Sequence, residues 1–258
     1  MLILLPPSEG KATPTRGKPL DPASLSFPSL TTARTDVRAA LVDLCTADPE
    51  KAAAVLGLGP TQLDLVARNG ALDGAPTARA ERIYTGVLYD ALDAATLSAA
   101  ARRRTTRVAV TSSLFGLVRL ADRIPSYRLS GDVTLPGLGP VAGVWRDHLG
   151  AAVTDALGAG LLVDLRSGTY AAFWRPTPDL AARVATVRVL HEHAGVRKVV
   201  SHFNKATKGR IVRAVLEDGG RPRTPTALAD QLRDLGWTVE VGAPGAKGTQ
   251  LDVVVTEV

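Results

Sequence analysis

A dense group of hydrogen-bond donors lies at residues 201–210, in the sequence SHFNKATKGR. Its cationic side chains are Lys205, Lys208 and Arg210. The group follows VRKVV, whose β-branched residues predict a strand, and precedes IVRAVLED, which has helical spacing. The start of a helix offers unpaired N–H groups and a positive dipole end, so cations beside it favour anion binding. We therefore expect an anion site at this strand-to-helix junction.

Polar residues also follow the first apolar run, LILL, which predicts a buried strand. The segment PPSEGKAT resembles a phosphate loop, but it lacks the first glycine of that motif and has Ala12 where Ser or Thr would hold magnesium. Ser8, Glu9 and Lys11 nevertheless lie at the carboxyl end of a strand, where α/β sheets place ligand groups. A capped turn leaving the sheet explains the same residues equally well.

The segment AAAVLGLGPTQLDLVARN has the outline of a helix-hairpin-helix. Gly57 and Gly59 would allow backbone amides and the following helix start to approach one phosphate, with Arg68 as the local cation. The alternative is an ordinary helix–helix corner with a glycine at the helix end. Taken alone, the segment favours the ordinary corner.

Arginines and aromatic residues are interleaved in VTSSLFGLVRLADRIPSYRLSG. Arg119, Arg123 and Arg128 suit phosphates, and Phe115 and Tyr127 suit stacked bases. A solvated loop with core aromatic residues is the alternative, and this segment alone favours it somewhat.

The sequence predicts no metal site and no cofactor. His191 and His193 share one side of a predicted strand without a third ligand, so we expect a surface pair. Cys45 is the one cysteine, which excludes an intramolecular disulfide and favours a reducing, cytoplasmic location. Its helical spacing predicts a buried apolar position and not a peroxide-sensing thiolate.

The surrounding elements must position these groups. Strands are predicted at LILL, RVAV, GLLVDL, TVRVLHEH and VRKVV, with WTVEV and QLDVVVTEV as a closing hairpin. Helices are predicted from the segments TDVRAALVDLC, EKAAAVLG, TQLDLVARN, WRDHLGAAVTDALG and TPTALADQLRDLG. The Pro-rich segment 6–30 is a long loop of the kind that covers a site. We expect a mixed α/β (α+β) fold in one domain over residues 1–258, with a central mixed sheet flanked by helices and a helical, hairpin-containing segment at 35–70.

Composition restricts the partners. The 258 residues include 31 Lys and Arg against 25 Asp and Glu, a formal charge of +6, which favours acidic partners without choosing among DNA, RNA and nucleotides. MLILL is too short for a signal sequence, and no apolar run reaches the roughly 18 residues of a membrane-spanning helix. The oligomeric state stays open.

Five segments together resemble one known family. MLILLPPSEGK, IYTGVLYDAL, SSLFGLVRLADRIPSYRL, VDLRSGTY and SHFNKATKGR have the order and type of the signature segments of the YaaA peroxide-stress protein family. The resemblance spans nearly the whole chain. It implies a cytosolic DNA-binding protein of the oxidative-stress response, with a helix-hairpin-helix and a basic cleft. It also implies that Lys205, Lys208 and Arg210 line that cleft.

The chain departs from the commoner family pattern at three places. Ser130 and Thr169 stand where acidic residues are usual, and the family's Lys-Lys-Ala-Arg-Gly run is replaced by a run from Lys205 to Gly209 with one cation fewer. Chemistry that needs those carboxylates is therefore in doubt.

Two classes of function follow. The favoured one is non-enzymatic binding of double-stranded DNA, with phosphate contacts from Lys11, Gly57, Gly59, Arg68, Arg119, Arg128, Lys205, Lys208 and Arg210. The alternative is an enzyme on a nucleotide or nucleoside. There Ser8, Glu9 and Tyr84 would be catalytic, with Glu9 as acid or base, in a phosphate-clamping pocket that also contains Lys11, Ser113, Arg128 and Lys205.

Overall fold

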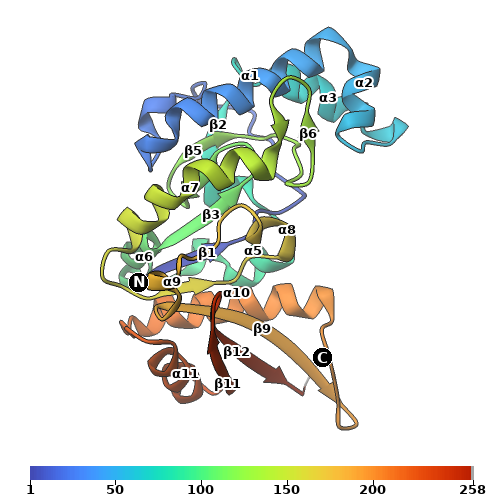
Figure 1. The fold of residues 1–258 in the computed structure, drawn as a ribbon. Helices are drawn as coiled ribbons and strands as arrows, with labels where there is room; N and C mark the ends of the chain where they lie inside the picture. Colours follow the sequence, from blue (N-terminus) through green and yellow to red (C-terminus); the bar gives the residue numbers. More distant parts are fainter. Residues whose placement is uncertain (257–258) are drawn as a thin grey trace.

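The computed structural model describes residues 1–256, apart from the side chains of Ser201 and His202. The predicted His202 donor and the last two residues of the predicted closing strand therefore lie outside the described part. An eight-stranded sheet has the order β11-β12-β9-β8-β1-β3-β4, with β10 paired to β9 (Figure 1). Its strands are β1 (Leu2–Leu5), β3 (Val108–Ser112), β4 (Gly116–Arg119), β8 (Leu162–Asp164), β9 (Val184–His193), β10 (Val196–Lys198), β11 (Thr238–Gly245) and β12 (Gly248–Val255).

The centre of the sheet is parallel and buried. Strand β1 pairs in parallel with β3 and β8, so that Ile3 lies opposite both Val108 and Val163. All four residues of β1 and all five of β3 are buried, because helices and loops cover both faces. The carboxyl ends of these strands therefore meet at one edge, where ligands usually bind in such sheets.

Antiparallel strands complete both sides of the sheet. Strand β4 returns along β3, and β11 and β12 form the closing hairpin that the sequence predicts. Two small sheets lie outside the main one: β2 (Thr77–Arg79) pairs with β5 (Arg123–Pro125), and β6 (Thr134–Leu135) pairs with β7 (Gly139–Pro140). The mixed sheet flanked by helices confirms the predicted fold class.

Helices begin where the sequence supplies caps. The Asp48 carboxylate accepts the Lys51 N–H at 3.0 Å, and Pro49 occupies the first turn of α2. The α-helices are α1 (Thr31–Ala47), α2 (Pro49–Val55), α3 (Leu63–Gly70), α4 (Ala80–Ile83), α5 (Val87–Leu92), α6 (Ala99–Arg104), α7 (Val141–Leu157), α8 (Gly168–Ala171), α9 (Pro178–Ala181), α10 (Ser201–Asp218) and α11 (Pro225–Asp234). Short 3₁₀ turns are η1 (Pro22–Ser24), η2 (Pro28–Leu30), η3 (Pro60–Gln62), η4 (Ala94–Thr96) and η5 (Thr105–Arg107).

The helices lie on both sides of the sheet (Figure 1). Helices α1, α2, α3 and α7 gather at one end of the molecule, whereas α10 and α11 lie at the other. A side chain at Gly116 on β4 would lie 2.6 Å from the Trp145 ring of α7, which shows how closely that helix packs on the strand. No helix among residues 1–256 is long and apolar enough to cross a membrane.

The donor-rich segment SHFNKATKGR is helical throughout, which corrects its expected position in a junction before a helix. Helix α10 starts at Ser201 and ends at Asp218, and it is capped by Gly219, whose φ is 83°. Within the segment the helix packs closely on α5, because a side chain at Gly209 would clash with the carbonyl oxygen of Leu88. Helix packing therefore fixes this segment, and its cations are distributed around a helix and not along a loop.

Candidate functional site

The polar loop after β1 and the segment after β5 meet at the carboxyl edge of the sheet. Lys11 makes a backbone bridge with Tyr84, which brings the loop against the end of α4. The Lys11 ammonium donates to the Ser8 carbonyl at 2.8 Å and lies 4.2 Å from the centre of the Tyr127 ring. The Arg128 guanidinium forms an ion pair with the Glu9 carboxylate. The structure thus brings together Lys11, Tyr84, Glu9 and Arg128, as the sequence predicts. We call this the Lys11–Arg128 site.

The environment of Lys11 disfavours its charged form. Burial among aromatic rings lowers the pKa of Lys11 to about 7, although the Glu9 carboxylate opposes the shift and the Arg128 guanidinium adds to it. A lysine with such a pKa is a substantial fraction neutral amine at neutral pH. It can therefore serve as a base or a nucleophile as well as a cation.

Glu9 and Ser8 are less well placed for catalysis than their sequence suggests. The Glu9 side chain is 59% exposed and forms an ion pair with Arg128. It therefore lacks the buried environment that a catalytic acid or base usually has. The Ser8 hydroxyl donates to the Gly10 carbonyl at 2.5 Å and accepts the Thr85 N–H at 3.1 Å. Ser8 thus shapes the turn, while the Nε atom of Arg128 is buried without a hydrogen-bond partner among the described residues.

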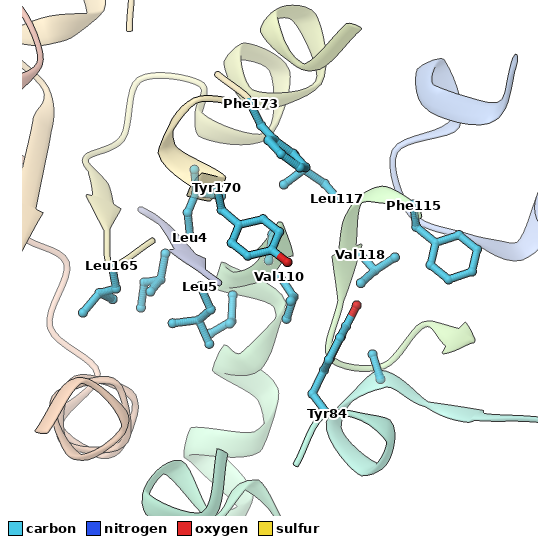
Figure 2. Close-up of a cluster of buried hydrophobic side chains, with 14 of the residues drawn as sticks. Leu4, Leu5, Tyr84, Val110, Phe115, Leu117, Val118, Leu165, Tyr170 and Phe173 are labelled. Atoms are coloured by element: carbon cyan, nitrogen blue, oxygen red, sulfur yellow. The ribbon is translucent and has the colours of Figure 1, made fainter. Parts of the chain in front are cut away.

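Buried phenols form the floor of the site. The hydroxyl of Tyr84 hydrogen-bonds that of Tyr127 at 3.1 Å, and Tyr127 hydrogen-bonds the Ser112 hydroxyl at 2.8 Å. Burial raises the pKa of both phenols, so they stay protonated at neutral pH. Figure 2 shows Tyr84 and Tyr170 within the apolar cluster, with their hydroxyls pointing into its interior. Ser113, expected in the same pocket, donates to the Leu129 carbonyl at 2.6 Å.

The segment of interleaved arginines is largely buried and not a solvated loop. Phe115 and Tyr127 are core residues whose rings meet edge to face, 5.6 Å apart. Arg119 is half-buried, donating to the Val108 carbonyl at 3.3 Å and lying 4.6 Å from the Phe27 ring. The aromatic residues here serve the core, as the alternative interpretation expected.

A corner between two helices lies at the segment AAAVLGLGPTQLDLVARN, and it contacts the Lys11–Arg128 site. Helices α2 and α3 are joined by a turn in which Gly57 has a φ of 63°, whereas Gly59 has an ordinary extended conformation. The Gly59 N–H is already bonded to the Gln62 side chain at 3.2 Å. In α3, buried Asn69 exchanges two hydrogen bonds with the main chain of Arg128, at 2.7 and 2.8 Å. The corner and the Lys11–Arg128 site are therefore connected through Asn69.

The cations of α10 do not share one environment. Lys205 and Arg210 are exposed, but Lys208 is buried, and its ammonium donates to the Leu165 carbonyl at 3.0 Å. Burial lowers the pKa of Lys208, with the Asp164 carboxylate opposing the shift. Lys208 thus fastens α10 to the end of β8 in this structure.

A second cationic surface was largely missed by the sequence reasoning. An open groove of about 630 Å³ lies beside the β2–β5 pair, and it is lined by Arg16, Thr77, Ala78, Arg79, Glu81, Arg82, Arg102 and Arg123. We call it the arginine groove. Glu81 lies at 3.6 and 3.5 Å from the guanidinium groups of Arg79 and Arg102. The sequence signal for the arginine groove was the position of Arg79 and Arg82 before the ARRR run. These arginines come together only when the chain folds.

The histidine pair differs from the expected surface pair. His193 is exposed, but His191 is 7% exposed and packs 5.1 Å from the Phe203 ring. Burial lowers the pKa of His191. Among the residues that the structure describes, no group of three or more His, Cys, Asp or Glu side chains is arranged to hold a metal.

Comparisons with known proteins identify the family of this chain. A family model described as peroxide stress protein YaaA matches residues 1–240. The chain belongs to the YaaA peroxide stress family. It is 56% identical to a UPF0246 protein of Streptomyces coelicolor over the full length of both. A UPF0246 protein of Corynebacterium efficiens is 44% identical, covering 98% of this chain and all of that protein, and one of Corynebacterium glutamicum is 41% identical, covering 93% and 95%.

Two of the positions where this chain departs from the commoner YaaA pattern lie close together. A side chain at Gly131, next to Ser130, would lie 3.1 Å from the methyl group of Thr169. Thr169 precedes Tyr170, whose raised pKa reflects burial first and the neighbouring Tyr127 and Glu9 next. Ser130 and Thr169 are neutral, so they add no negative charge beside the Glu9 carboxylate near Tyr170.

Proposed function

We propose that this YaaA-family protein acts in the cytosolic response to peroxide by binding the phosphate backbone of double-stranded DNA. The observation that carries the proposal is the segment from Arg123 to Arg128, which joins three cationic features. Arg123 lines the arginine groove, the Ser126 hydroxyl lies 3.5 Å from the Arg68 guanidinium, and Arg128 belongs to the Lys11–Arg128 site. One short segment thus links three cationic features, each of which suits contact with a phosphate oxygen.

The chemistry of the arginine groove favours backbone contact over base recognition. Five guanidinium groups face one carboxylate, that of Glu81, so the groove has an excess of positive charge. None of its described lining residues is aromatic, so it offers no platform for stacked bases. Binding through it should be insensitive to sequence and sensitive to salt.

The corner between α2 and α3 is the second contact in this proposal. The Gly59 N–H is held by the side chain of Gln62, which can rotate away and leave the amide to a phosphate. Arg68 follows in α3 and also contacts Asp64 at 3.4 Å, an exposed pair that contributes little to stability. Exposed Lys205 and Arg210 are further candidate contacts, whereas buried Lys208 would act through the position of α10.

The test is the salt dependence of duplex binding. Removing both Arg79 and Arg82 by substitution with Ala should reduce the slope of log K against log salt by about 0.9 for each phosphate that the variant no longer neutralises. Arg223→Ala, which removes one exposed charge between α10 and α11, is the matched control and should leave the slope unchanged. A double variant with the wild-type slope and affinity would remove the arginine groove from the interface.

A second candidate is an enzyme that acts on a nucleotide or nucleoside. It is favoured by the buried Nε atom of Arg128, which has no partner in the described part of the chain, beside Lys11 and the Tyr84–Tyr127 hydrogen bond. More polar groups converge there than backbone binding requires. Binding of a panel of mononucleotides that Arg128→Gln abolishes, with duplex affinity retained, would favour this candidate. Failure of every mononucleotide to bind would exclude it.

A further inference from the structure

Two groups in the Lys11–Arg128 site lack the partners that their chemistry calls for. Glu9 is engaged by Arg128, and among the described residues no carboxylate lies within ion-pair distance of the Lys11 ammonium. The buried Nε of Arg128 donates to nothing in the described structure. Burying a donor without a partner costs roughly 1–3 kcal/mol, so a ligand that accepts from it would recover that cost.

The two groups select different parts of one ligand. A guanidinium with a free donor suits an oxyanion, and phosphate satisfies it with directed hydrogen bonds. A lysine amine that is partly neutral at neutral pH, owing to burial against Tyr127 and Tyr84, suits an electrophilic carbon. The rings of Tyr84 and Tyr127 lie against one side of this amine.

We propose that the Lys11–Arg128 site binds a phosphorylated aldehyde and that the amine of Lys11 forms an imine with it. This inference goes beyond DNA binding, because a small phosphorylated aldehyde is a sufficient ligand. Sugar aldehydes that carry phosphate are also what oxidation of DNA releases or leaves within the strand. The same site would therefore meet them during peroxide stress if the proposed function holds.

The condensation is balanced without an oxidant or a reductant. The Lys11 nitrogen attacks the carbonyl carbon, a C–N bond forms, and the carbonyl π electrons move to oxygen. The nitrogen gives up two protons, the oxygen receives two, and the C–O bond breaks to release water. The hydroxyls of Tyr84, Tyr127 and Ser112 form a hydrogen-bonded series, and the Lys11 ammonium lies 5.7 and 4.2 Å from the centres of the Tyr84 and Tyr127 rings.

Reductive trapping tests the inference on the full chain. Incubation with 2-deoxyribose 5-phosphate and sodium cyanoborohydride should add one ligand per protein, and peptide mapping should place it on Lys11. Trapping should accelerate as pH rises through 7, because the neutral amine is the nucleophile. The partly buried terminal amine of Met1, whose pKa burial also lowers, is the principal competing site. Labelling spread over Met1 and exposed lysines without preference for Lys11 would overturn the inference.

Variants separate the amine from the phosphate contact. Lys11→Arg keeps the charge and should abolish trapping, whereas Lys18→Arg, an exposed lysine on the same loop, should retain it. The phosphorylated sugar should react roughly tenfold faster than 2-deoxyribose at equal concentration, and Arg128→Gln should bring that ratio close to one. Undiminished trapping in folded Lys11→Arg, or a ratio of one in the wild type, would contradict the proposal.

These outcomes are independent of duplex binding. Mapping of the adduct in the wild-type protein decides the role of Lys11 even if a variant fails to fold. A protein that traps the aldehyde but does not bind duplex DNA would disprove the proposed function and leave this inference standing. A protein that binds duplex DNA and leaves Lys11 unmodified would disprove this inference and leave the proposed function standing.

Discussion

The side-chain amide of Asn69 pairs with the main chain of Arg128, giving its N–H to the Arg128 carbonyl at 2.7 Å and accepting the Arg128 N–H at 2.8 Å. Asn69 is fully buried in α3, 59 residues from its partner in the chain. This pairing joins the corner of α2 and α3 to the segment after β5, whose Arg128 forms an ion pair with Glu9 in the loop that contains Lys11. It makes the position of Arg128 depend on α3.

Loss of the Asn69 amide should therefore affect stability and DNA binding together. Asn69→Ala leaves the N–H and C=O of Arg128 without partners and should lower the free energy of unfolding by at least roughly 1–3 kcal/mol. Urea denaturation measures this change. Asp73→Ala, which removes an exposed carboxylate paired with Arg38, is the control and should change stability by about 0.5 kcal/mol or less. Equal stability of the two variants would show that the pairing contributes nothing.

The two glycines of the corner should respond differently to substitution. Gly57 has a φ of 63°, so Gly57→Ala should destabilise the protein by roughly 1 kcal/mol through backbone strain alone. Gly59 has a φ of −78°, and a side chain there meets no atom within 4 Å, so Gly59→Ala should leave thermal stability unchanged or slightly raised. Thermal unfolding of both variants checks this difference.

The same absence of strain makes Gly59 a direct test of DNA contact. Gly59→Val should keep its fold and should weaken duplex binding if the amide approaches a phosphate, because the added side chain blocks that approach. Binding of mononucleotides at the Lys11–Arg128 site should be unaffected. A folded Gly59→Val protein that binds duplex DNA as tightly as the wild type at several salt concentrations would identify the corner as purely structural.

Protein stability should depend on pH through Lys11. The pKa of Lys11 is lowered to about 7 in the folded state and is near 10.4 in an unfolded chain, so the unfolded state binds more protons between these values. The free energy of unfolding should consequently rise with pH from about 7 to about 10, by at most about 1.4 kcal/mol per pH unit from this group. In Lys11→Met that rise should be absent. Parallel pH profiles for the two proteins would show that Lys11 is not perturbed.

Cys45 should behave as a core residue under peroxide. It is 4% exposed in α1, and burial raises the pKa of its thiol, although a hydrogen bond with Asn69 opposes the shift. Low exposure and the raised pKa both suppress the thiolate that reacts with peroxide. A thiol reagent should label the native protein far more slowly than the urea-unfolded protein. Cys45→Ser should keep any protection that the wild type gives to cells exposed to peroxide, and a loss with stability intact would contradict this expectation.

The sequence by itself determined the elements whose signals are local. The apolar run of β1, the proline and cap before α2 and the closing β11–β12 hairpin depend on neighbouring residues, and the structure contains each of them. The enzyme alternative also grouped Ser8, Glu9, Lys11 and Tyr84 in one pocket, and in the structure Lys11 contacts Ser8 and Tyr84. Residue types and their spacing carry this information because they set strand periodicity, helix ends and turn geometry.

The tertiary structure decided which polar groups face solvent and which partners they meet. Lys208 is cationic in the sequence, but helix packing turns it to the Leu165 carbonyl, and α10 begins at Ser201, so the expected junction is part of a helix. Five arginines between Arg16 and Arg123 form a groove only because β2 pairs with β5. Burial and long-range pairing set these environments, and neither is encoded in the spacing of nearby residues. The pKa of Lys11 arises in the same way, from aromatic rings that lie far from it in the chain and against it in the fold.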